Sequence, residues 1–343
     1  MWRPKHHEFW NSHVFHLPVY IYWLWLSLKA RSPFFFSAAN PVIETGGLLG
    51  ESKIDILNRI DRVYIPETIY YSTAPTLEKV LYDINARNIR FPFVLKPDIG
   101  QGGWLAEVIY NQQQLARYLS MIRMPFLLQE FIAEPEEYGL LYYRMPGAVG
   151  GVISSLAVKK FLSVTGDGVS SVWELMQRDE RARPQISRVK GNAVIDLLWV
   201  PARGEVIRLS EIGNHSYGTT FHDARNLIDS QLTAKMDEIC SRIDGFYFGR
   251  FDIKCRDEQA LKSGDFKILE LNGVGSEPLH IFDPGISVMS AYRDALRHWG
   301  IIYEISKCNV SRYPYMKLTD ALKYFRNFVR FQRMHSQRLT IGN

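Results

Sequence analysis

Apolar and polar positions along the chain follow two different periods. Apolar residues at helical spacing predict helices near 53–62, 76–87, 112–121, 172–179 and 224–243. Shorter apolar runs bounded by turn residues predict strands near 64–69, 91–96, 108–110, 126–132, 138–145, 151–160, 206–211, 247–255 and 266–272. Helices and strands do not alternate regularly, and two of the strands flank the turn Met145–Ala148. We therefore predict an α+β fold with antiparallel hairpins.

The N-terminal region contains an aromatic and apolar run, Leu17–Leu28, which ends at Lys29 and Arg31. The run is shorter than the roughly 20 residues that span a bilayer. No small-residue cleavage site follows it, as one would after a secretory signal. We therefore expect a helix that is buried or lines a groove. Contact with a membrane surface and export stay open, because tyrosine and tryptophan also favour a membrane interface.

The C-terminal end, from Thr319, has the pattern of an amphipathic basic helix. Its apolar stripe is formed by Leu322, Phe325, Phe328 and Val329. The cations around the stripe are Lys323, Arg326, Arg330, Arg333 and Arg338. We expect this helix to pack on the body with a solvated basic face. A phosphorylated, acidic or membrane-surface partner is the alternative.

Composition narrows the class of protein. At 343 residues the chain is long enough for two or three packed units with a cleft between them. A hydrophobic content of 46% and a charged content of 22% exclude disorder along the whole chain. The net charge of +5 does not require nucleic acid, since an anionic small ligand accounts for it equally well. Three scattered cysteines without a CxxC motif favour a reducing, cytoplasmic compartment over a disulfide framework or a zinc site.

The last two predicted strands carry candidate metal ligands. Side chains of a strand alternate between its faces, so Arg250 and Asp252 share one face of the first strand. Glu270 and Asn272 likewise share one face of the second. If the strands pair, two carboxylates and an amide oxygen converge, a set that suits Mg²⁺ bound together with nucleotide phosphates. A surface hairpin with scattered charges is the alternative, although a charge at Glu270 in an apolar strand is costly unless paired or metal-bound.

An anion-binding loop is predicted after the strand near 91–96. The strand ends at Lys96, and Gly100, Gly102 and Gly103 follow. A lysine beside the backbone N–H groups of a glycine-rich loop can bind phosphate. A strand, a lysine and a turn also occur together in many folds without a ligand. The loop is neither a P-loop nor a dinucleotide-binding loop, because GxxxxGK[ST] and GxGxxG are both absent from the sequence.

Two further segments suit a nucleotide site. A glycine-containing segment follows Lys159 and includes Gly166 and Gly168. It is either a loop that closes over a triphosphate or a plain hairpin turn. The strand Leu127–Ile132 runs into a connector whose backbone groups suit an adenine edge, and Glu137 beyond it suits ribose hydroxyls.

In this order the motifs resemble the ATP-grasp superfamily, and most nearly its D-alanine–D-alanine ligase and cyanophycin-synthetase-like branch. The resemblance extends from about Ser52 to Pro284, and its most specific part is GRFD followed by LELNG. It implies an ATP-grasp fold in which two α+β lobes enclose a nucleotide cleft, with a short atypical helical N-terminal region and a C-terminal helical tail. The expected divisions are an N-terminal region 1–72, a small lobe 73–132, a large lobe with the metal site 133–300 and a tail 301–343.

The resemblance also implies roles for individual residues. Nucleotide binding would involve Lys53, Lys96, Gln129, Glu130, Ile132, Glu137, Lys159, Gly166 and Gly168. Two Mg²⁺ ions would be bound by Asp252, Glu270 and Asn272. The transferred phosphoryl group and the acceptor would face Arg250, Asn214 and His215, with His215 either a general base or a structural residue. The resemblance does not extend to the substrate, but Glu277 and His280 are polar residues at the mouth of the expected cleft and are candidates for substrate contact, unless both only form turns.

Two departures from the family leave the substrate open. Only about 50 residues precede Lys53, and they contain the aromatic run in place of a recognisable substrate-binding half. The segment after Asn272 also lacks the usual Ser-Pro-Gly ending.

The implied function is an ATP- and Mg²⁺-dependent carboxylate–amine ligase that forms an amide through an acyl phosphate. Its partners would be small-molecule or peptide-like carboxylates and amines, with no nucleic acid. An ATP-grasp kinase acting on a small-molecule hydroxyl is one alternative, and a non-catalytic nucleotide-binding protein is another. The sequence does not identify the carboxylate, the nucleophile, the oligomeric state or the role of residues 1–45.

Overall fold

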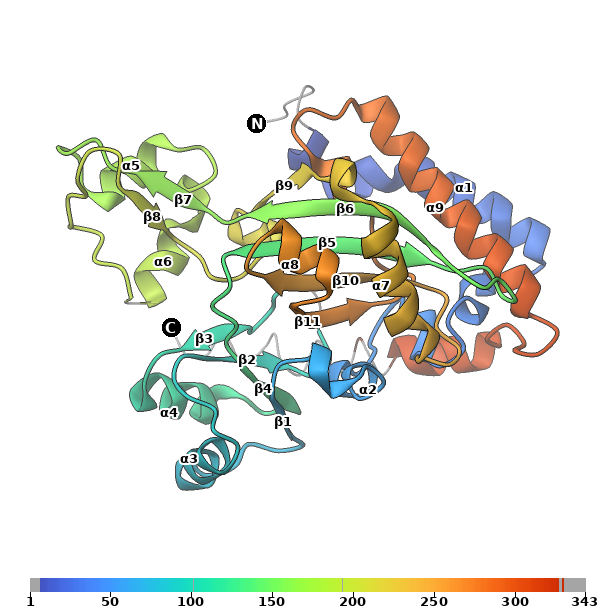
Figure 1. Ribbon diagram of the computed structural model, residues 1–343, viewed down its shortest axis with the longest axis horizontal. Helices are drawn as coiled ribbons and strands as arrows, with labels where there is room; N and C mark the ends of the chain where they lie inside the picture. Colours follow the sequence, from blue (N-terminus) through green and yellow to red (C-terminus); the bar gives the residue numbers. More distant parts are fainter. Residues whose placement is uncertain (1–6, 101, 193, 327–328, 330–343) are drawn as a thin grey trace.

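The computed structural model describes residues 7–100, 102–192, 194–326 and 329 (Figure 1). They form two α+β lobes, a small inserted unit, and a helical layer against the large lobe. Each pair of neighbouring strands in these ranges is antiparallel. The predicted α+β class with antiparallel sheets is therefore confirmed.

The small lobe is a four-stranded sheet with two helices on one face. The strands run in the order β1 (Thr68–Tyr71), β4 (Phe126–Glu130), β2 (Phe93–Pro97), β3 (Glu107–Ile109). The helices are α3 (Leu77–Ala86) and α4 (Gln112–Met121). Apolar side chains of both helices pack against Phe93, Leu95 and Phe126 of the sheet. Because strand side chains alternate, Lys96 and Gln129 lie on the opposite face, toward the large lobe.

The large lobe is a five-stranded sheet. Its strands run in the order β11 (Phe266–Asn272), β10 (Phe248–Cys255), β5 (Glu136–Tyr143), β6 (Val152–Lys160), β9 (Thr220–Asp223). The helices α2 (Lys53–Leu57), α7 (Ser230–Ser241) and α8 (Glu258–Ser263) share one core with this sheet. Phe251, Ile253 and Ile268 lie in that core, so the alternate residues of β10 and β11 are left to face the small lobe.

An inserted unit projects from the end of β6 (Figure 1, left). It consists of β7 (Ser163–Thr165), α5 (Val172–Arg178), α6 (Ile186–Asn192) and β8 (Val206–Arg208). These elements bury their own small core around Val172 and Met176. The unit is therefore a separate packing cluster attached to the large lobe.

Several element boundaries differ from the sequence prediction. The helix expected over 53–62 ends at Leu57, and a short 3₁₀ turn, Arg62–Tyr64, follows it. The helix expected from 224 begins at Ser230, because the side chain of Asp229 accepts the N–H of Leu232 and caps the helix there. The edge strand β9 and the long helix α9 (Val288–Asn309) were not predicted.

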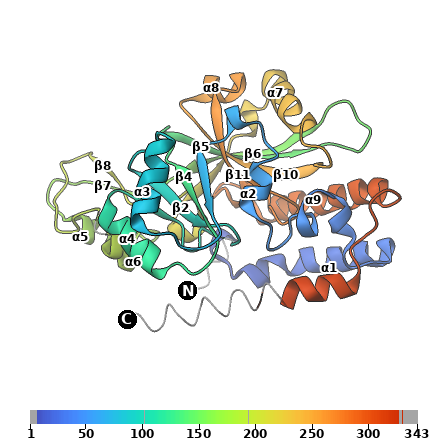
Figure 2. The ribbon, with the colours of Figure 1, turned by 90° about the horizontal axis from the view of Figure 1, so that it is seen from below.

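The aromatic run of the sequence lies in α1 (Ser12–Ala30), which packs against α9 (Figure 2). Phe15, Val19 and Leu26 are buried between α1 and the body. The prediction of a buried helix holds for this side alone, because the outer side of α1 is exposed. Among the described residues, no helix combines the length and the apolarity needed to cross a bilayer.

The C-terminal prediction is confirmed only in part. Residues 318–326 are helical, and Tyr324 anchors them through its hydroxyl, which donates to the Glu44 carboxylate. The expectation that the apolar stripe packs on the body is wrong for Leu322 and Phe325, which are each 59% exposed. The other predicted tail positions Phe328, Arg330, Arg333 and Arg338 lie outside the described residues.

Candidate nucleotide and metal site

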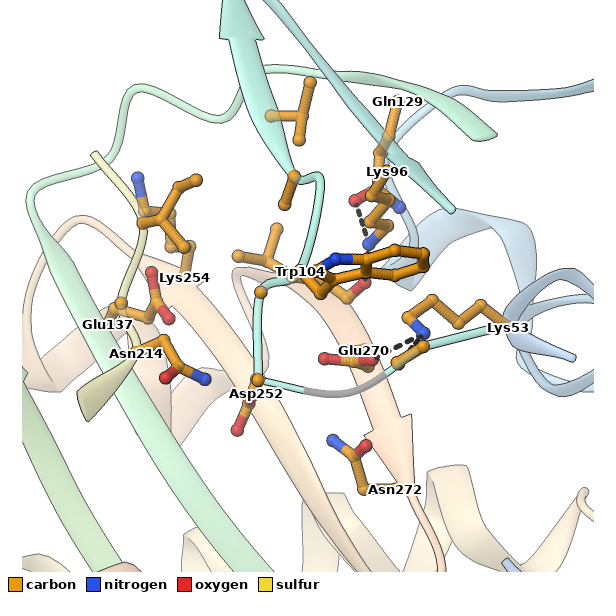
Figure 3. A pocket seen from close by; sticks show the side chains of 18 of the residues that line it. Lys53, Lys96, Trp104, Gln129, Glu137, Asn214, Asp252, Lys254, Glu270 and Asn272 are labelled. Carbon is orange, nitrogen blue, oxygen red and sulfur yellow. Dashed lines mark hydrogen bonds and ion pairs between the residues drawn. The ribbon is translucent and has the colours of Figure 1, made fainter. Parts of the chain in front are cut away.

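A cavity of about 330 Å³ lies between the two sheets (Figure 3). Its walls come from β2 and β4 of the small lobe and from β5, β10 and β11 of the large lobe. The structure brings together here most of the side chains singled out in the sequence: Lys53, Lys96, Gln129, Glu130, Ile132, Glu137, Lys159, Asn214, Arg250, Asp252, Glu270 and Asn272. Gly166, Gly168, His215, Glu277 and His280 do not line it.

One wall is built by the paired strands β10 and β11. Arg250 lies opposite Asn272, and Asp252 lies opposite Glu270. Directly opposed residues of an antiparallel pair project to the same face, so all four side chains face the cavity. A register shift after Asp252 leaves Leu269 as an extra residue in β11, and its carbonyl accepts a hydrogen bond from Lys96 Nζ at 3.0 Å.

Asp252 is held as an ionised carboxylate. Its Oδ1 accepts from Arg250 Nε at 3.1 Å, and its Oδ2 lies 3.0 Å from Lys159 Nζ. Burial disfavours the negative charge, but Lys159 and Arg250 outweigh it and keep the pKa of Asp252 below its usual range. An ionised, buried carboxylate at the cavity wall is suited to bind a cation.

Lys159 joins this carboxylate to a second one. Its Nζ donates to Glu137 Oε1 at 2.8 Å, and its side chain is only 3% exposed. Burial disfavours the ammonium charge, yet Asp252 and Glu137 raise the pKa of Lys159 above its ordinary value. Lys159 is therefore a fixed positive charge between the predicted metal site and the predicted ribose carboxylate.

Two further lysines approach from the opposite side. Lys53 Nζ lies 3.6 Å from Glu270 Oε1 and donates to the backbone carbonyl of Gly100 at 2.6 Å. Lys96 Nζ donates to Gln129 Oε1 at 2.9 Å, and burial lowers the pKa of Lys96 to about 8. An anion in the cavity would raise the pKa of Lys96 again, because a nearby negative group favours the protonated form.

The donor set fits Mg²⁺ shared with a phosphate. Asp252, Glu270 and Asn272 provide hard oxygen donors, and the Nδ2 of Asn272 is buried without a hydrogen-bond partner in the described part of the chain. Within the described ranges no cluster of three or more carboxylate, histidine or cysteine side chains forms a closed metal cage. Mg²⁺ commonly takes one or two carboxylates and completes its shell with water and phosphate oxygens.

The glycine-rich loop after β2 is fixed by the large lobe. Ser216 Oγ donates to the carbonyl of Gly102, and Tyr217 OH donates to that of Gly103, each at 2.9 Å. Gly103 has φ +73°, and a Cβ there would lie 2.9 Å from the Tyr217 ring. Glycine is therefore required by both conformation and space, and the loop is held beside the cavity.

Some residues of the cavity were missed from the sequence. Lys254, two residues beyond Asp252 on the same face, donates to the carbonyl of Ile132 at 2.8 Å. The alternation of β10 could have revealed it. The Trp104 ring crosses the cavity, and a buried Oε2 of Glu51 has no hydrogen-bond partner among the described residues. Burial raises the pKa of Glu51, and no sequence pattern marks it or Trp104 as part of the site.

The second glycine segment lies away from the cavity. The N–H of Gly166 donates to the carbonyl of Glu205 at 2.8 Å, and a Cβ on Gly166 would lie 2.2 Å from the carbonyl of Ala202. Gly168 has φ +80° in the turn that follows. This placement inside the inserted unit corrects the expectation of a loop over the triphosphate and matches the alternative of a structural turn.

Two of the predicted histidines occupy packing positions. His280 is fully buried, and its ring nitrogens lie 2.7 Å from Ser155 Oγ and 3.0 Å from Asp294 Oδ2. Its expected contact with substrate is therefore corrected to a place in the core. His215 stacks on Phe221 with ring centroids 6.1 Å apart, and burial lowers its pKa. That position corresponds to the structural alternative for His215.

Glu277 lies beside the site without lining it. Its backbone carbonyl accepts from Arg250 Nη1 at 3.3 Å, and its carboxylate Oε1 lies 2.5 Å from His16 Nε2. The pKa of His16 is raised, chiefly by this hydrogen bond. Glu277 therefore connects α1 to the arginine of the cavity wall, and its side chain is directed to the helix.

Comparison with known proteins gives matches at the level of structure. No protein-family model matches the sequence, and no curated protein does. A D-alanine–D-alanine ligase from Bacillus anthracis matches with a TM-score of 0.45 at 12% identity, over 77% of this chain and 69% of that chain. The VanG D-Ala:D-Ser ligase from Enterococcus faecalis matches with a TM-score of 0.42 at 11% identity, over 75% of this chain.

A bifunctional glutathione synthetase from Pasteurella multocida matches with a TM-score of 0.38 at 15% identity, over 77% of this chain. The chain spans 63% of the D-Ala:D-Ser ligase and 37% of the glutathione synthetase. At these TM-scores the overall match is loose, so the chemistry of the cavity rests on its own geometry.

Proposed function

We propose that the cavity binds Mg-ATP and that the protein is an ATP-grasp carboxylate–amine ligase. One observation carries the proposal: the paired strands β10 and β11 present the carboxylates Asp252 and Glu270 to a cavity between two sheets, and Lys53 and Lys96 line the same cavity. Carboxylates and cations that line one cavity suit a polyphosphate bound together with metal. We also propose a cytoplasmic location, because ATP would be the co-substrate.

The chain's own residues would bind and orient the nucleotide. Lys53 and Lys96 would neutralise phosphate oxygens, and the connector after β4, anchored by Lys254, would hold the base. Glu137 would accept hydrogen bonds from ribose hydroxyls while Lys159 holds its carboxylate in place. Each of these groups lines the same cavity, so none needs to move far to make its contact.

Asp252, Glu270 and Asn272 would hold Mg²⁺, which would neutralise the phosphates and orient the γ-phosphoryl group for transfer. Arg250 extends from the same strand face and would neutralise charge that spreads over the transferred group. A substrate carboxylate oxygen would bond to the γ-phosphorus as the bond to ADP breaks. An amine would then attack the acyl carbon and release phosphate, which leaves an amide.

The test is a screen of amino acids and acidic metabolites, singly and in pairs, for Mg²⁺-dependent turnover of ATP. A ligase yields ADP, free phosphate and a new amide in equal amounts when acid and amine are both present. A kinase would instead yield ADP and a phosphoester without free phosphate. Absence of Mg-ATP binding by calorimetry would reject the proposal altogether.

A further inference from the structure

The outer side of α1 is a continuous row of apolar side chains. Exposed residues recur every three or four positions along the helix, and the row comprises Val14, Leu17, Ile21, Leu24 and Leu28. They are 54–78% exposed, and the neighbouring Tyr20 and Trp25 are 45% and 49% exposed. Monomeric proteins seldom expose so long an apolar surface unless it binds something.

The exposed charges on and beside α1 are mostly positive. α1 contains no carboxylate, and Lys29 and Arg31 are exposed at its C-terminal end. On the neighbouring helix α9 the exposed cations are Arg293, Arg297 and Lys307. Of the two carboxylates in α9, Asp294 is buried and Glu304 is exposed. The surroundings of the apolar row therefore favour an anionic partner.

A second exposed row lies on the helical residues 318–326. Leu318, Leu322 and Phe325 are 59–60% exposed, and the exposed charges beside them are Lys317, Asp320, Lys323 and Arg326. Figure 2 shows this helix, in red, and α1, in blue, along the same lower edge of the molecule. In Figure 1 the two helices lie apart, α1 at the upper right and the red helix at the lower right, so a partner that contacts both must be broad and flat.

We propose that this face, formed by α1 and residues 318–326, binds the surface of a membrane that contains anionic lipids. The apolar rows would enter the boundary between headgroups and acyl chains, with Tyr20 and Trp25 at the level of the headgroups. Lys29 and the cations of α9 would interact with lipid phosphates. A second copy of the chain fits less well, because pairing the same face would bring like charges together.

The proposal is tested with the full-length protein and vesicles of phosphatidylcholine containing about one third phosphatidylglycerol. Cosedimentation should show binding that weakens with salt and is much lower on pure phosphatidylcholine. Ile21→Glu/Leu24→Glu should lower the partition coefficient about tenfold or more, because two charges replace inserted apolar groups. Lys29→Gln should lower it about fivefold through loss of one cation.

Val149→Glu/Leu198→Glu is the matched control, because both residues are exposed apolar positions that belong neither to α1 nor to residues 318–326. It should bind vesicles like the unchanged protein, and circular dichroism should show that both double variants are folded. Equal binding of the two double variants, or no binding of the unchanged protein, would overturn the proposal. A dimer in sedimentation velocity that Ile21→Glu/Leu24→Glu dissociates, without vesicle binding, would assign the face to a second copy instead.

Discussion

Replacing Lys159 with methionine would remove the positive charge that holds two buried carboxylates together. Lys159 Nζ lies 2.8 Å from Glu137 Oε1 and 3.0 Å from Asp252 Oδ2. The side chains of Lys159, Glu137 and Asp252 are 3%, 5% and 11% exposed. Methionine fills a similar volume, so the change tests charge more than packing.

The expected loss in the free energy of unfolding is about 3–5 kcal/mol, the usual effect of removing one partner from a buried ion pair. Asp252 keeps Arg250 as a partner, which favours the lower end of that range. The pKa of Asp252 is lowered in the folded protein, so its pairing stabilises the fold at neutral pH. That stabilisation is lost as the pH falls through the folded-state pKa. The difference between the two proteins should therefore be largest at neutral pH and narrow on acidification.

Urea unfolding followed by circular dichroism at neutral pH and at a pH below about 4, where an aspartate begins to protonate, measures this difference. Lys160→Met is the matched control, because the adjacent Lys160 is 56% exposed and pairs with Glu136 at 3.2 Å. An exposed pair contributes only about 0–1 kcal/mol. If Lys159→Met proves no more destabilising than Lys160→Met, or if its effect does not depend on pH, the buried charge pairing described here is wrong.

Two other predictions concern the nucleotide side of the cavity. Because the pKa of Lys96 is about 8, the apparent Kd for ATP measured by calorimetry should rise up to about tenfold between pH 7 and 9, and Lys96→Arg should remove that dependence. A pH-independent Kd in the unchanged protein would refute the assignment of Lys96. Gly103→Ala should weaken ATP binding, since the new Cβ would lie 2.9 Å from the Tyr217 ring. The control is Gly147→Ala, where φ is +84° and a Cβ would meet nothing within 4 Å, and it should lower only thermal stability. Equal ATP affinities of the two variants would contradict a role of the glycine-rich loop in ATP binding.

The shared faces within β10 and β11 were predictable because strand side chains alternate, whereas the sequence left the pairing of the two strands open. Arg250 and Asp252, and likewise Glu270 and Asn272, are spaced by two residues within apolar strands, so their shared face followed from the sequence. Lys96 could also be predicted as a site residue, because it stands at the end of an apolar strand. The order of these motifs then indicated which elements enclose the cavity.

Other features depend on contacts that no local pattern encodes. The turn around Gly166 has the same composition whether it covers a phosphate or packs inside the inserted unit. Its position is evident only from the tertiary structure, in which Gly166 lies against the backbone of Ala202. Glu51 reaches the cavity because the segment before α2 bonds to the chain just after β11, where the N–H groups of Val274 and Gly275 donate to the carbonyls of Gly46 and Gly47. α1 is apolar all round, so periodicity could not tell which side the body covers.

The position of His280 likewise could not be predicted from the local sequence. His280 follows the metal-site strand closely in sequence, yet the 3₁₀ turn Leu279–Phe282 directs its ring into the core beside Ser155 and Asp294. Its two hydrogen-bond partners come from β6 and α9, which are far from it in sequence or in a different element. A polar residue near a predicted site is thus a weak guide to function without tertiary contacts.

The metal site is tested most directly by calorimetric titration of ATP with and without Mg²⁺, using Glu270→Gln beside the control Glu304→Gln. In the unchanged protein and the control, Mg²⁺ should strengthen ATP binding and support ADP formation. Glu270→Gln should stay folded, lose the effect of Mg²⁺ and form no ADP. Mg²⁺-dependent ADP formation by Glu270→Gln at the rate of the unchanged protein would contradict the assignment of the β10–β11 face as the site of metal-assisted phosphoryl transfer.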